Sequence, residues 1–165
     1  DAVGECFDKV ARMLGLGYPG GPIIDRVAKS GDPAAVAFPR PQPNDLDFSF
    51  SGLKTSVRTH LSKDGRATDA DVCASFQAAA VDCLVRRTVK AAAKMGFDQV
   101  ALGGGVAANS HLRAELARTG LNVFCPPIKR CTDNAAMIAH AGRLHLLAGR
   151  RDELDFGARS SWAVE

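Results

Sequence analysis

The sequence predicts a helix-rich α/β fold with a small sheet, on three observations. A long segment at residues 71–95 has apolar side chains at helical spacing and ends at Gly96. Two short apolar runs, at 99–102 and 123–125, have the length and composition of strands. A helical segment at 110–118 separates them, and this strand–helix–strand order is typical of an α/β layer.

The residues before this layer begin with a predicted helix. Apolar residues recur at helical spacing over residues 3–14, Asp1 could cap the first turn, and the glycines at 15–17 should end the helix. The segment Tyr18-Pro19-Gly20-Gly21-Pro22 is typical of a tight turn because it combines proline with glycine. A short helix is expected after this turn, over 23–28.

The middle of the chain and its C-terminal part complete the expected order. Glycine and prolines predict an irregular stretch at 31–43, in which residues 36–38 could form a short strand. Alternating residues at 47–51 predict a strand that leads into a helix at 52–61. A last helix is expected over 134–148.

Length and composition restrict the class of protein. The 165 residues are 46% hydrophobic and 24% charged, which is ordinary for a soluble globular domain and excludes a fibrous or disordered chain. No apolar run reaches the ~20 residues that span a bilayer, so no membrane partner is expected. The five cysteines form no Cys-x-x-Cys pair, which favours a reducing, cytoplasmic compartment. Because Asp1 stands where Met would begin a chain, a longer protein is expected.

Charge is distributed unevenly along the chain. The formal net charge is +3, yet residues 84–151 carry eleven lysines and arginines against three acidic residues. A basic stretch inside an otherwise near-neutral chain suggests an anionic partner. Solvated helix faces explain the same charges equally well.

The segment from Leu102 to Asn109 is the first candidate site. Glycines between the end of a strand and the start of a helix allow a ligand to approach the backbone, and free amides at the helix start attract phosphate or carboxylate. Gly103, Gly105 and Ala108 fit the dinucleotide pattern, but the next strand ends without the acidic residue that this pattern needs. Asn109 could donate to a ligand's base or sugar, or cap the helix.

Three aspartates are further candidates, each with a structural alternative. Asp133 could supply a hard oxygen to a metal or bind a ligand hydroxyl, whereas Thr132 or Asp133 could simply cap the last helix. Asp8 interrupts an apolar helix face and could pair with a neighbouring basic residue. Asp25 and Gly21 could together hold a sugar hydroxyl, although turns of this kind are mostly structural. The histidines have no metal-binding spacing, and no nucleophile with its base is visible.

Five segments together resemble the TsaD family, in the order and at the approximate spacing of that family, over essentially the whole chain. They are Asp1 to Glu5 with Phe7-Asp8-Lys9, Tyr18 to Pro22, Phe48 to Thr55, Gly103 to Asn109, and Cys131 to Met137. The resemblance implies an actin-like, sugar-kinase-like (ASKHA) fold. Residues 1–165 would form a single C-terminal lobe of a two-lobed enzyme, with the N-terminal lobe absent from this chain.

The resemblance also implies an activity: transfer of a threonylcarbamoyl group from threonylcarbamoyl-AMP to the exocyclic amine of the tRNA adenosine next to the anticodon. By position, Asp8, Gly21, Asp25 and Asn109 match the family's substrate-binding residues, and Asp133 matches its ligand to iron or zinc. That metal also needs a His-x-x-x-His pair, which this chain lacks, so the isolated chain is expected to be inactive. No catalytic side chain is identified. Accessory subunits (TsaB and TsaE in bacteria) are implied partners, and the basic stretch is a candidate tRNA surface.

Two other functions remain open at this point. An ATP-dependent phosphotransferase or ATPase of the same superfamily would share the glycine loop and the carboxylates. A non-catalytic scaffold subunit would share the fold but could dispense with the site, and here all the candidate residues are retained. The former description of the family as glycoproteases has the least support, because neither a zinc-protease motif nor a nucleophile is present.

Overall fold

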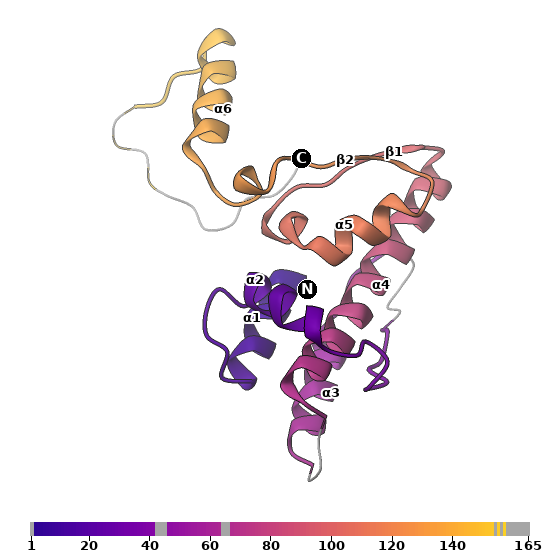
Figure 1. The fold of residues 1–165 in the computed structure, drawn as a ribbon. Coiled ribbons are helices and arrows are strands. Elements are labelled where there is room, and N and C mark those ends of the chain that lie inside the picture. Colours follow the sequence, from indigo (N-terminus) through magenta and orange to yellow (C-terminus); the bar gives the residue numbers. More distant parts are fainter. Residues whose placement is uncertain (1, 42–45, 64–66, 154, 156, 158–165) are drawn as a thin grey trace. The chain divides into compact units, whose positions relative to one another are not determined.

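The computed structural model describes residues 2–41, 46–63, 67–153, 155 and 157 (Figure 1). The chain divides into two compact units, Asp1–Thr132 and Asp133–Glu165. The first unit contains, in order, α1 (Val3–Met13), α2 (Gly20–Val27), the 3-10 turn η1 (Ala28–Ser30), α3 (Ser51–Leu61), α4 (Asp69–Met95), β1 (Gln99–Ala101), η2 (Gly105–Ala108), α5 (Ser110–Ala117), β2 (Asn122–Phe124) and η3 (Ile128–Arg130). The second unit contains α6 (Ala135–Leu147). Whether residues 1–165 act as one lobe stays a prediction.

The small sheet of the predicted α/β layer is present and parallel. Val100 of β1 lies opposite Val123 of β2, and α5 forms the crossover between the two strands. Parallel neighbours require such a crossover because a tight hairpin can join only antiparallel strands. The helix-rich α/β prediction is therefore confirmed. We call residues 99–131, which contain β1, α5, β2 and their loops, the sheet region.

Four helices, α1 to α4, build the main core, and we call them the helical platform. Phe7 of α1 meets Phe76 of α4 edge to face, with ring centroids 4.9 Å apart, and both side chains are at most 2% exposed. Ile24, Leu53 and Val57 are fully buried in the same cluster. The predicted helices thus form because each buries one apolar face against the others.

The longest helix, α4, is fixed at both ends by its own sequence. The hydroxyl of Thr68 accepts a hydrogen bond from the Asp71 N–H at 3.2 Å, which satisfies one of the free donors of the first turn. Gly96 ends the helix with φ +71°, as predicted, because a left-handed residue at this position costs glycine little. The helix starts two residues earlier than predicted.

The segment before α3 contains none of the strands that the sequence predicted. Residues 36–38 and 47–51 are not paired with another strand in the part of the chain that the structure describes, so both strand predictions are wrong. Phe48 and Phe50 instead lie beside each other, and their rings stack with centroids 6.2 Å apart. Phe50 is buried in the helical core, so its burial needs no partner strand.

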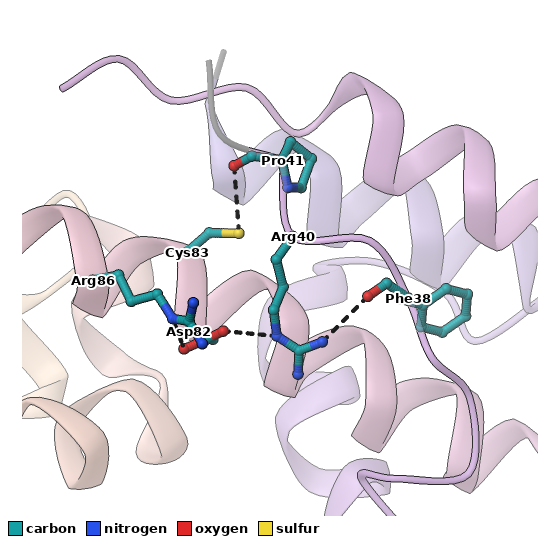
Figure 2. A network of polar contacts seen from close by, with 6 residues as sticks. All are labelled: Phe38, Arg40, Pro41, Asp82, Cys83 and Arg86. Atoms are coloured by element: carbon teal, nitrogen blue, oxygen red, sulfur yellow. Dashed lines mark hydrogen bonds and ion pairs between the residues drawn. The ribbon is translucent and has the colours of Figure 1, made fainter. Parts of the chain in front are cut away.

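Side-chain contacts fasten the proline-rich segment to α4 (Figure 2). Asp82 accepts hydrogen bonds from the Nε of Arg40 and from the Nε of Arg86, both at 2.7 Å. Arg40 also donates to the carbonyl oxygen of Phe38 at 3.3 Å. Prolines cannot donate from the backbone, so this segment is held by side chains where a strand would be held by its ladder.

Other boundaries differ slightly from those predicted. Helix α2 begins at Gly20, so the expected turn at 18–22 contributes its last three residues to the helix. Pro22 is tolerated there because the first turn of a helix has no acceptor for its missing N–H. The proposed cap at Asp1 lies outside the described residues. None of the helices in the described ranges has the length and apolar character needed to cross a membrane.

Candidate functional site

The glycine loop after β1 offers open backbone. Gly104 has φ +80° and ψ 175°, a conformation that is essentially restricted to glycine. A Cβ placed on Gly103, Gly104 or Gly105 would meet no atom within 4 Å. Within the described residues, the N–H groups of Gly103 and Gly104 donate no hydrogen bond. The loop therefore presents unused donors beside free space, which is the backbone arrangement that an anionic ligand can approach.

Asn109 begins α5 as its cap. Its Oδ1 accepts the Leu112 N–H at 2.8 Å, and its Nδ2 donates to Oε1 of Gln77 in α4, also at 2.8 Å. Asn109 and Gln77 are both buried. The capping role considered from sequence is confirmed. A bond from Asn109 to a ligand stays a prediction, and the amide retains one N–H and one acceptor position for it.

Asp8 joins α1 to the start of α2. Its Oδ1 accepts the Gly20 N–H at 2.7 Å, which satisfies a donor that the first turn of α2 leaves free. The expected pairing of Asp8 with a basic neighbour is not what the structure shows, because Lys9 pairs with Glu5. The helices approach so closely here that a Cβ on Gly20 would lie 2.7 Å from the Cβ of Ala11.

Gly21 lies in the first turn of α2, and Asp25 lies one turn further along the same helix. A Cβ on Gly21 would meet no atom within 4 Å, so this position faces open space. The two carboxylate oxygens of Asp25 accept the hydroxyl of Ser110 at 2.8 Å and the Ser110 N–H at 3.2 Å. Asp25 therefore ties α2 to the N-terminus of α5, where a carboxylate is favourable.

These contacts bring four predicted residues of the first unit into one connected set. Asp8 holds the start of α2, where Gly21 lies, and Asp25 holds the start of α5, where Asn109 lies. Asn109 in turn connects to α4 through Gln77. The structure thus connects the N-termini of α2 and α5, and the N-terminus of α5 follows the glycine loop in the chain, an arrangement that suits the positioning of a polar ligand.

Asp133 belongs to the second unit and does not cap a helix. Asn134 is the cap of α6, and its Oδ1 accepts the Met137 N–H at 3.1 Å. The alternative that Thr132 or Asp133 caps the last helix is therefore wrong, because the residue directly before Ala135 has the extended backbone that a cap requires. Asp133 is exposed, and its carboxylate contacts no described residue by hydrogen bond or ion pair.

The described residues do not by themselves assemble a metal centre. No group of three His, Cys, Asp or Glu side chains within them is arranged to hold an ion. Asp133 offers one free carboxylate, which is a suitable but insufficient ligand for iron or zinc. The residues present therefore do not fit a complete site, and no chemical step is assigned to a metal here.

Buried cysteines do not supply a nucleophile. Burial raises the pKa of the Cys6 and Cys73 thiols to about 11, and burial also raises the pKa of Cys83. The thiolate is the reactive form, so these three side chains are inert near neutral pH. These three thiols are therefore not candidates for a catalytic nucleophile.

Two arginines of the basic stretch make contacts inside the first unit. Arg87 is 7% exposed and its guanidinium carbon lies 5.8 Å from the centre of the Phe48 ring. Arg113 donates to two backbone carbonyls. Arg86, by contrast, is largely exposed although it pairs with Asp82. The tRNA surface suggested from sequence over residues 86–151 therefore includes too many residues, because the distribution of charge along the sequence does not distinguish buried from exposed cations.

Sequence reasoning missed three polar residues of the site. Ser110 is the partner of Asp25, Gln77 is the partner of Asn109, and Arg113 contacts the glycine-loop segment. Gln77 had a signal, since it is a polar residue inside the apolar run at 72–81. Ser110 and Arg113 had none, because their partners are far away in sequence or are backbone carbonyls.

The first unit is an α/β structure with a candidate ligand site at the carboxyl ends of two parallel strands, a position typical of ligand sites in this class. Its sequence matches the family described as "TsaD: tRNA N6-adenosine threonylcarbamoyltransferase" over residues 1–140. The chain belongs to this family.

Relatives with the name tRNA N6-adenosine threonylcarbamoyltransferase agree with this assignment. The protein of Sorangium cellulosum is 53% identical over 175 residues, which cover 99% of this chain and 49% of that protein. The protein of Anaeromyxobacter dehalogenans strain 2CP-1 is 52% identical over 99% of this chain and 52% of its own length. The protein of Thermotoga neapolitana is 55% identical over 149 residues, which cover 86% of this chain and 45% of that protein. The chain thus spans about half the length of the curated relatives it matches.

Proposed function

We propose that this chain is part of a tRNA threonylcarbamoyltransferase and that it holds the nucleotide end of threonylcarbamoyl-AMP. In the proposed reaction the exocyclic amine of the adenosine next to the anticodon attacks the carbamoyl carbon. The bond from that carbon to the phosphate oxygen breaks, AMP leaves, and the amine gives up a proton. Family membership and the names of the relatives support the reaction, since each is named for it.

The observation that carries the assignment of the nucleotide is the open glycine loop. Unused N–H groups at Gly103 and Gly104 lie beside empty space, and they precede the helix that Asn109 begins. A phosphate held there would receive backbone hydrogen bonds without competing with the protein's own bonds. Its negative charge grows as AMP leaves, so such donors would stabilise the transition state more than the bound substrate.

The polar side chains would orient the rest of the donor substrate. Gly21 faces open space, and Asp8 and Asp25 each retain acceptor positions beyond the bonds that they make in the structure. A carboxylate with a fixed direction can accept from a ribose hydroxyl at small entropic cost. Asp133, whose carboxylate is free, would be one ligand of an iron or zinc ion whose remaining ligands lie outside the described residues.

The wider assembly is part of the same proposal. The fold would be the C-terminal lobe of an actin-like, two-lobed enzyme in the cytoplasm, with tRNA and accessory subunits such as TsaB and TsaE as partners. Because the chain spans about half of its relatives, it would not transfer the group alone. An ATP-dependent phosphotransferase would use the same loop for phosphate, so the test must distinguish the two reactions.

The test restores the missing half and follows labelled threonine into tRNA. A hybrid protein would carry this chain in place of the matching half of the Sorangium cellulosum relative, with threonylcarbamoyl-AMP and the accessory proteins supplied. Transfer by the hybrid and a loss of about 100-fold or more in Asp133→Ala are expected, because a metal ligand would be gone. Asp98→Ala, at another exposed aspartate, is the matched control and should retain full transfer.

Three other outcomes have distinct meanings. Transfer that is insensitive to Asp133→Ala would keep the activity and remove the metal role. Phosphate release from ATP without transfer would favour the phosphotransferase. Nucleotide binding without either reaction would favour the scaffold function.

A further inference from the structure

Arg113 of α5 joins the two loops that follow the parallel strands. Its Nε donates to the carbonyl oxygen of Ala107 at 2.5 Å, in the loop after β1. Its Nη2 donates to the carbonyl oxygen of Pro126 at 2.6 Å and lies 3.2 Å from the sulfur of Cys131, both in the segment after β2. Within the described residues, no backbone hydrogen bond joins residues 103–109 to residues 125–131. Arg113 therefore connects the two segments that follow the strands, where the hydrogen bonds of the sheet have ended.

The bridge is partly shielded from water. Ala107 is fully buried and Cys131 is 4% exposed, while Arg113 itself and Pro126 are half-buried. Hydrogen bonds are stronger where water is excluded, and those from a charged donor are stronger again. The planar guanidinium has several donors in a fixed fork and can serve both loops at once, whereas the single ammonium of lysine cannot reproduce that geometry.

We propose that Arg113 is a positioning residue that sets the orientation of the glycine loop for transfer. This inference rests on the proposed function. Ala107 follows the glycines by two residues, and its N–H donates to the carbonyl oxygen of Gly104 at 3.0 Å. The bond from Arg113 to the Ala107 carbonyl oxygen therefore limits how far the free N–H groups of Gly103 and Gly104 can turn. Donors already aimed at the leaving phosphate need no reorganisation as its charge develops. Arg113 touches neither substrate nor reacting atoms in this scheme and acts through the loop.

The expected signature is a loss of rate with little loss of binding. A loosened loop can still wrap around a bound phosphate, but it holds that phosphate in many orientations. In the hybrid enzyme, Arg113→Lys should lower kcat about 10- to 100-fold, as misplacements near 1 Å do. Its KM for threonylcarbamoyl-AMP should change by less than about threefold, because the interaction matters mainly in the transition state.

Two comparisons separate positioning from a general structural role. Arg118→Lys is the matched control, because Arg118 lies on the same helix and pairs with Glu115 at the surface. It should leave kcat, the KM for threonylcarbamoyl-AMP and the melting temperature unchanged, because lysine keeps the positive charge that a tRNA surface would use. For Arg113→Ala, added guanidinium ion at concentrations that do not unfold the protein should restore at least about a tenth of the lost kcat, since it can occupy the vacated fork. Unfolding or mispacking would not be repaired in this way.

Amide hydrogen exchange tests the bridge without any activity. Arg113→Lys should accelerate exchange in the peptides that contain residues 103–109 and 125–131, whereas Arg118→Lys should not. Unchanged exchange in both peptides, or a kcat equal to that of the parent hybrid, would overturn the inference. A parallel fall of kcat, binding and melting temperature without rescue would also overturn it. A parent hybrid that shows no transfer refutes the proposed function instead, and the exchange experiment then still decides whether Arg113 orders the loops.

Discussion

The helical platform and the sheet region differ in how they use their side chains. The platform buries large apolar groups from four helices in one cluster, with Phe7, Phe50 and Phe76 almost completely inaccessible. In the sheet region, Leu112 and Leu116 form only a small cluster with Val81 of α4, and Phe124 and Ile128 are more than 60% exposed. Stability is therefore concentrated in the platform, whereas open backbone, which a ligand requires, is concentrated in the sheet region. Local opening is expected first where few apolar contacts must break.

Replacing a buried and an exposed phenylalanine should show the largest difference between the two regions. Phe76→Ala removes a fully buried ring that contacts Phe7, and should lower the free energy of unfolding by about 3–5 kcal/mol. Phe124→Ala removes a ring that is 61% exposed and should change the free energy of unfolding by less than about 0.5 kcal/mol. Urea unfolding of the chain measures both. Equal losses would show that the two regions share one core.

Substitution of one glycine in each region tests the same difference, because Gly31 is closely surrounded and Gly103 is not. A Cβ on Gly31 would lie 2.0 Å from the carbonyl oxygen of Ala70, in the first turn of α4, so Gly31→Ala should cost at least about 2 kcal/mol of stability. Gly103→Ala, in open space, should leave stability almost unchanged but weaken the binding of an adenine nucleotide. Thermal unfolding and titration calorimetry distinguish these effects. Weakened stability in Gly103→Ala with intact binding would contradict a ligand role for the loop.

The smallest expected effect is a pH dependence within the platform. The Asp71 carboxylate accepts the Asp32 N–H at 2.8 Å and the Thr68 hydroxyl at 2.7 Å, and these bonds hold the pKa of Asp71 below its usual range. A lowered folded-state pKa gives stability that is complete above the unfolded-state pKa and is lost as pH falls through the folded-state value. Asp71→Asn should therefore flatten the decline of the melting temperature below about pH 4. An unchanged slope would show that other carboxylates dominate acid unfolding.

Local sequence signals were sufficient for most of the fold. The C-terminal end of α4 was predictable because Gly96 acts locally, and the strands of the small sheet were predictable from their apolar runs. The prediction of a strand at 47–51 was wrong because alternation indicates only which side chains share a face. Phe50 satisfies that alternation by burial among helices, and no sequence signal says whether a neighbouring strand is available.

Several members of the candidate site were predictable from the sequence, but their partners and connections were not. The glycine loop and the cap at Asn109 follow from residue type and position. The contacts of Asp25 with Ser110 and of Asn109 with Gln77 join residues that are 85 and 32 positions apart. Such pairs depend on how α2, α4 and α5 pack, so no local rule could identify them.

The sequence by itself determined the family, the order of the helices and of the two paired strands, and the place of the glycine loop, because each follows from local backbone preferences or from residue order. Only the tertiary structure decided that Arg87 is buried, that Asn134 rather than Asp133 caps α6, and that Arg113 bridges the two loops. The physical reason is that burial and hydrogen-bond choice depend on neighbours in space. A side chain with several possible partners binds those that packing places within reach.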